Sequence, residues 1–98
     1  MNKFPSKEQL INLLKYYKSG NFNETIKHSL YLTKSFPNHP FAWKTLALSF
    51  EKEGKILKSL NANQKAKEIN PKDPDVFNNL GNIFQKLKKL RLFLVCIV

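Results

Sequence analysis

The sequence has little of what catalytic and metal sites are built from. It contains one cysteine, Cys96, which excludes an intramolecular disulfide, and its two histidines, His28 and His39, show no spacing typical of a metal site. Glu51 and Glu53 point to different faces of a helix, which removes a paired acid and base, and no glycine-rich phosphate loop occurs. We therefore expect that the chain is not an enzyme and that it needs no metal or other cofactor.

Long apolar runs are missing as well. No stretch approaches the ~20 apolar residues that are needed to cross a bilayer. Residues 1–14 contain no continuous apolar core of the kind that a secretory signal needs. A lone cysteine is typical of a reducing compartment. Together these absences predict a cytoplasmic protein.

Negative charge is scarce, because 7 Asp and Glu stand against 17 Lys and Arg and the formal net charge is +10. Such an excess is typical of proteins that bind nucleic acid or an anionic membrane. However, the lysines are scattered, with one cluster at Lys86, Lys88, Lys89 and Arg91, and eleven asparagines indicate a general Lys and Asn bias in the coding sequence. We expect neither nucleic acid nor a membrane as the partner, and keep non-specific binding of these anions as an alternative.

What the sequence does contain is a repeat. Apolar residues at i, i+3, i+4 and i+7 from Trp43 to Phe50 predict one face of a helix, which Gly54 ends. A second helix follows from Ile56 and stops before Pro71. The same pattern returns 34 residues away in both directions, at Gly20 and Gly54, Pro37 and Pro71, Trp43 and Phe77, Ala47 and Gly81, and Tyr16, Phe50 and Phe84. A helix-turn-helix unit of about this length is typical of a solenoid.

Residues that begin helices stand at the expected places. Ser6 with Gln9 predicts a capping box for the first helix. Pro40 predicts the start of the third helix, and His39 before it is expected to act as its cap. Asp73 is expected to cap the fifth helix, because its carboxylate can accept hydrogen bonds from the free amides of the first turn.

These patterns resemble the tetratricopeptide repeat (TPR) family. Its order of Trp, Leu before a small residue, an aromatic, a small residue, Ala and Pro is matched by Trp43, Leu46, Ala47, Phe50, Ser59, Ala66 and Pro71, and the third copy opens with Phe77, Leu80, Gly81 and Phe84. The resemblance implies an all-α, right-handed α-solenoid of TPR helical hairpins. It gives one array, 1–98, with repeat 1 at 6–39, repeat 2 at 40–73 and an incomplete repeat 3 at 74–98. Small residues at 47 and 81 are expected where paired helices cross closely, so larger side chains should overpack by roughly 1–3 kcal/mol.

The family pattern fails at the end of the chain. The repeat predicts a small residue at 93 but the chain has Phe93, and Leu92 to Val98 is an unbroken apolar run. Three explanations are open: a shortened or frame-shifted end of a longer product, a sixth helix packed on Phe84 and Leu87, or a docking segment for a partner or membrane surface. Self-association through this run is open as well.

The resemblance implies a protein-protein interaction module or scaffold that binds a peptide or partner helix in a concave groove, and the lysine excess favours an acidic partner. The groove should be lined by residues next to the buried stripe of each repeat's first helix. We expect these to be Leu14, Tyr17, Lys18, Lys44, Thr45, Leu48, Lys52, Asn79, Asn82 and Lys86. The basic clamp with which some TPR domains hold acidic peptides is absent. An N-terminal TPR scaffold fragment of a larger bacterial-type transferase, with its catalytic domain outside this sequence, is another alternative.

Overall fold

The computed structural model describes residues 4–97, without the side chains of residues 93 and 95–97. The described residues form five α-helices and no strand, which confirms the all-α prediction. In chain order the helices are α1 (Lys7–Lys18), α2 (Phe22–Ser35), α3 (Pro40–Lys52), α4 (Ile56–Ile69) and α5 (Pro74–Ile97).

The first helix begins as its sequence predicts. The Ser6 hydroxyl accepts a hydrogen bond from the Gln9 amide at 3.1 Å, and the Gln9 side chain accepts one from the Ser6 amide at 2.8 Å, which completes the capping box. At the start of α5, the Asp73 carboxylate accepts a hydrogen bond from the Asp75 amide at 3.0 Å, so this predicted cap is also confirmed.

The predicted cap at His39 is wrong. This residue occupies the position before Pro40, but its side chain makes no hydrogen bond to the first turn of α3. The imidazole packs edge-on against Phe4, with ring centroids 6.0 Å apart. Its ring is therefore used in packing and accepts no hydrogen bond from the first-turn amides of α3.

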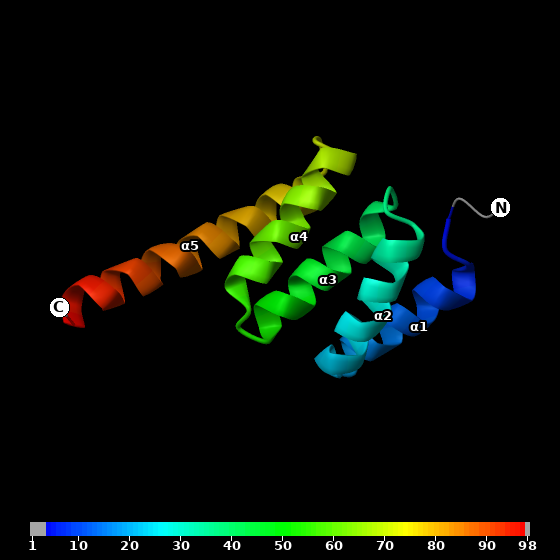
Figure 1. The fold of residues 1–98 in the computed structure, drawn as a ribbon, viewed down its shortest axis with the longest axis horizontal. Helices are drawn as coiled ribbons and strands as arrows, with labels where there is room; N and C mark the ends of the chain where they lie inside the picture. Colours follow the sequence, from blue (N-terminus) through cyan, green and yellow to red (C-terminus); the bar gives the residue numbers. More distant parts are fainter. Residues whose placement is uncertain (1–3, 98) are drawn as a thin grey trace.

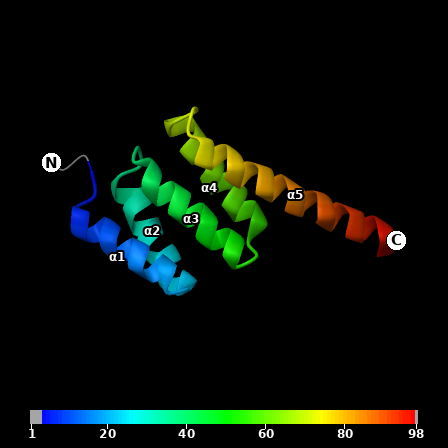
Figure 2. The same cartoon turned by 180° about the vertical axis from the view of Figure 1, so that it is seen from behind.

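Two glycines turn the chain between paired helices. Gly20 follows α1 with a φ of 78°, and Gly54 follows α3 with a φ of 77°. These angles lie in the left-handed region, which glycine adopts without the steric cost of a Cβ atom. As a result, α1 with α2 and α3 with α4 form two antiparallel hairpins (Figure 1). In Figure 2, α1, α3 and α5 run in the same direction on one side of the molecule, with α2 and α4 behind them.

The core is a series of small clusters along the chain. The first joins α1, α2 and α3 through Leu13, Leu32 and Ala42. The next two clusters continue the series from α2 to α5, and Trp43 packs against both. Because each cluster joins neighbouring helices in sequence order, every helix is held chiefly by those before and after it. The molecule is correspondingly elongated, with extents of 54 × 28 × 19 Å.

The sequence predicted that paired helices cross closely at residues 47 and 81, and the structure shows this only at Ala47. Ala47 is fully buried, and its carbonyl oxygen accepts a hydrogen bond from the Ser59 hydroxyl at 2.6 Å, so α3 and α4 meet there. Gly81 is exposed instead, and a Cβ atom added to it would meet nothing within 4 Å. The overpacking expected at Gly81 is therefore wrong, because Gly81 lies on the exposed side of α5, where no described part of the chain packs against it.

Of the three explanations left open for the apolar run, a sixth helix packed on Phe84 and Leu87 does not fit the described residues. The chain does not turn after Leu90 but continues as α5 to Ile97, away from the rest of the molecule (Figures 1 and 2). Phe84 is 55% exposed as a result. Val98, the last residue of the predicted apolar run, lies outside the described residues.

Candidate functional site

The predicted binding residues lie on α1, α3 and α5, the three helices that share one side of the molecule (Figure 2). Their positions repeat at the 34-residue interval, as in Leu14, Leu48 and Asn82. Leu14 and Asn82 are exposed and Leu48 is half-buried. We call the accessible part of this surface the odd-helix face, which consists of Leu14, Lys18, Leu48, Lys52 and Asn82.

Lys44 serves an internal role. Its ammonium donates hydrogen bonds to Asp73 at 2.8 Å and to Asp75 at 3.1 Å, and so ties α3 to the start of α5. Burial lowers the pKa of Lys44, but the two carboxylates outweigh burial and raise this pKa above its ordinary value. The hydrogen bond from Lys44 in turn holds the pKa of Asp73 below its ordinary value.

Lys86 of α5 forms a similar ion pair with a carboxylate near the other end of α3. Its ammonium lies 2.9 Å from the carboxylate of Glu51, whose side chain is only 10% exposed. The α3 and α5 helices are therefore joined by ion pairs near both ends of α3. These contacts help to set the relative position of α3 and α5, and they pair both lysines with carboxylates of the chain itself.

The remaining predicted residues are partly or wholly covered. Thr45 is buried, and its hydroxyl donates a hydrogen bond to the carbonyl oxygen of Phe41 at 2.9 Å. Tyr17 is half-buried against Phe22, with ring centroids 5.7 Å apart. Asn79 is half-buried too. The five residues of the odd-helix face are thus the predicted residues that a partner can reach most readily.

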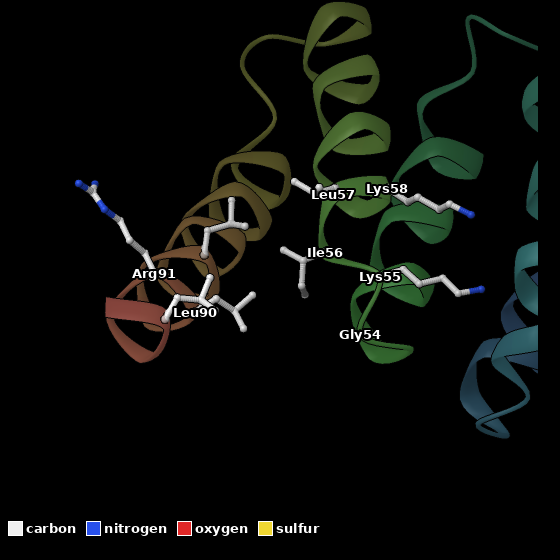
Figure 3. Close-up of a pocket in the computed structure, with 9 residues that line it drawn as sticks. Gly54, Lys55, Ile56, Leu57, Lys58, Leu90 and Arg91 are labelled. Carbon is white, nitrogen blue, oxygen red and sulfur yellow. The ribbon is translucent and has the colours of Figure 1, made fainter. Parts of the chain in front are cut away.

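A second surface was not predicted from the sequence. An open groove of ≈ 1030 Å³ lies between the start of α4 and the later half of α5 (Figure 3). We call it the α4–α5 groove; its lining residues are Gly54, Lys55, Ile56, Leu57, Lys58, Leu87, Leu90, Arg91 and Leu94. Leu87, Leu90 and Leu94 recur at helical spacing, and this was the signal in the sequence that could have revealed it.

The two histidines lie apart and have separate packing roles. His28 stacks on Tyr16, with ring centroids 4.8 Å apart, and its ring nitrogen is 3.4 Å from the carboxylate of Glu24. Burial lowers the pKa of His39. Within residues 4–97 no three His, Cys, Asp or Glu side chains gather in a way that could hold a metal ion.

No family model matches the chain, and no curated protein matches it. The part of the chain that the structure describes has no helix both long and apolar enough to span a membrane.

Proposed function

We propose that the chain is a right-handed α-solenoid of the TPR type and that it works as a protein-protein interaction module, binding a short segment of a partner on the odd-helix face. The 34-residue period supports the fold, because some positions one period apart have matching environments. Gly20 and Gly54 have nearly the same positive φ, and Ala42 and Val76 are both fully buried.

The observation that carries the proposed function is the division of each odd-numbered helix into a buried and an accessible stripe. In α1, Leu13 is fully buried while its neighbour Leu14 is exposed. In α3, Ala47 is fully buried while Leu48 is only half-buried. The first stripe is buried by packing between helices, and the second stripe stays at the surface. The hairpins and the ion pairs set the relative positions of the three helices that carry it.

This surface carries the chemistry that an extended segment needs. Leu14 and Leu48 offer apolar contact, and the Asn82 amide can both donate to and accept from a peptide backbone. Lys18 and Lys52 favour a partner with carboxylates and accelerate its encounter at low salt. Because the helices are already in place, binding does not have to order them, which preserves affinity.

The test is selection of random displayed peptides on the whole chain, followed by affinity measurements on a variant with Lys52→Glu and Asn82→Ala. Both residues are exposed, so the fold should survive. We expect the selected peptides to bind the variant about tenfold more weakly, equivalent to ~1.4 kcal/mol.

A matched control applies the same two changes to exposed residues of the even-numbered helices, as Lys34→Glu with Asn61→Ala. This control has the same net charge as the test variant and should bind as the unmodified chain does. Failure to select any peptide, or equal losses in the two variants, would contradict binding at the odd-helix face.

A further inference from the structure

The α4–α5 groove exposes large apolar side chains that no described part of the chain covers. Leu57 is 70% exposed, Leu90 is 50% exposed and Leu94 is 61% exposed, and they line one continuous hollow. Figure 3 shows Ile56 and Leu57 on α4 facing Leu90 of α5 across it. Contiguous exposed apolar surface of this kind marks interaction sites in soluble proteins.

The dimensions of the groove suit an α-helix. Leu87 and Leu94 are seven residues apart on α5, which corresponds to ~10 Å or about two helical turns. The preceding hairpin shows what covers an odd-numbered helix: Phe50 of α3 packs with Ala62 of α4 and is 8% exposed. Phe84, one period later on α5, lacks such a neighbour and is 55% exposed.

The charges around the groove define the partner further. The charged residues that line it are Lys55, Lys58 and Arg91, and no carboxylate is among its lining residues. In Figure 3 Lys55 and Lys58 extend from the start of α4 away from the groove and Arg91 extends outward from α5, and the Lys58 ammonium lies 5.8 Å from the Phe50 ring centroid on α3. The three cations therefore lie outside the groove, beyond α4 on one side and beyond α5 on the other, where carboxylates along both flanks of an occupant could reach them.

Two other possible occupants of the groove are a second copy of this chain and a lipid bilayer. A second copy of this chain also carries +10, and pairing α5 with α5 would bring Lys88, Lys89 and Arg91 of both copies together. A bilayer presents a broad surface, whereas these leucines line a hollow between two helices. Charge disfavours a second copy, and the shape of the hollow disfavours a bilayer.

We propose that the α4–α5 groove docks an amphipathic α-helix of a partner protein, with leucine-like side chains in the groove and carboxylates along both flanks. Apolar side chains at i, i+3 or i+4, and i+7 of that helix would fill the groove. This site is separate from the odd-helix face, and it binds its helix whether or not that face binds a peptide.

The first experiment measures binding of the whole chain to two synthetic helical peptides of about 15 residues, long enough for partial helix formation in water. The peptides share one leucine stripe and carry either glutamates or lysines on both flanks. We expect the glutamate peptide to bind at least about tenfold more tightly, and a glutamate peptide with serines in place of the leucines not to bind. Equal affinities, or no binding by the glutamate peptide, overturn the proposal.

Paired variants locate the site. Leu57→Gln with Leu94→Gln should abolish binding of the glutamate peptide, and both residues are exposed enough for the fold to tolerate the change. The matched control is Leu30→Gln with Leu92→Gln, which are similarly exposed but lie outside the groove. Equal effects of the two pairs would show that leucine loss acts generally, and would overturn the proposal.

A charge exchange tests the flanks. Lys55→Glu with Arg91→Glu should reverse the preference toward the lysine peptide, whereas Lys34→Glu with Lys89→Glu, with the same net charge, should leave it unchanged. Sedimentation of the chain alone tests for a dimer, and sedimentation with phosphatidylserine vesicles tests for membrane binding. If the chain forms a dimer or binds vesicles, and the combined Leu57→Gln and Leu94→Gln changes abolish this, the groove binds a second copy or a membrane. Either result would overturn the proposal of a partner helix.

Discussion

Two phenylalanines one repeat apart give the sharpest test of how this fold is held together. Phe50 is 8% exposed and packs in the cluster that joins α2, α3 and α4, whereas Phe84 is 55% exposed on α5. Phe→Ala in a packed core costs ~3–5 kcal/mol, because burial is lost and a cavity is left. Less than half of the Phe84 side chain is covered, so we expect its replacement to cost about 1 kcal/mol, the corresponding share of the ~1.5–3 kcal/mol of full burial.

The assay is urea unfolding of the Phe50→Ala and Phe84→Ala variants, followed by the helical circular dichroism signal. With a slope of ~1.5 kcal/mol per molar urea, the midpoint should fall by ~2 M or more for Phe50→Ala and by ~0.7 M for Phe84→Ala. A Lys58→Ala variant is the control for the ammonium that lies 5.8 Å from the Phe50 ring centroid. Equal losses at the two positions would refute the reasoning, since they would mean that α5 is covered as completely as α3.

Three further predictions follow from single side chains. Gly54→Ala should lower the melting temperature, because its φ of 77° costs an L residue ~1–2 kcal/mol, whereas Gly81→Ala should raise it, because alanine is ~0.5–1 kcal/mol better in an open helical position. His39→Asp should raise the urea midpoint by supplying a cap worth ~0.5–2 kcal/mol, as Asp73 does one repeat later. Since the hydrogen bond from Lys44 lowers the pKa of Asp73 from its ordinary 3.8, the unfolded chain takes up a proton there first, and stability should fall as pH drops through 3.8 toward the native pKa. Urea midpoints measured across this pH range should depend less on pH in an Asp73→Asn variant.

Local features of the fold were predictable from the sequence because local chemistry decides them. The capping box needs only Ser6 and Gln9, three residues apart, and both of its hydrogen bonds are present. The turns at Gly20 and Gly54 follow from the freedom of glycine to take a positive φ. Residues within a few positions of one another specify these structures, so no knowledge of tertiary contacts was required.

Contacts between distant residues were harder to predict. Lys44 was expected at a binding surface, but Asp73 and Asp75, 29 and 31 residues later, neutralise it internally. Both carboxylates lie at the start of α5, and helical periodicity does not say which side chain of α3 they meet. The same limitation applies to Lys86 and Glu51. A face of a helix can be assigned from spacing, whereas the partners of its charged residues depend on how the helices pack.

The lysine at position 88 contributes to both the missing turn and the unpredicted groove. Gly20 and Gly54 end α1 and α3, and one period later position 88 is a lysine. A positive φ at a lysine costs ~1–2 kcal/mol of conformational free energy, so a turn like those at the glycines is disfavoured here. The surrounding Lys, Leu and Arg residues are good helix formers. The helix therefore continues through Lys88 and carries Leu90 and Leu94 beyond the end of the α3–α4 hairpin. With a glycine turn at 88 these leucines would leave the axis of α5, so the α4–α5 groove exists because the helix does not stop.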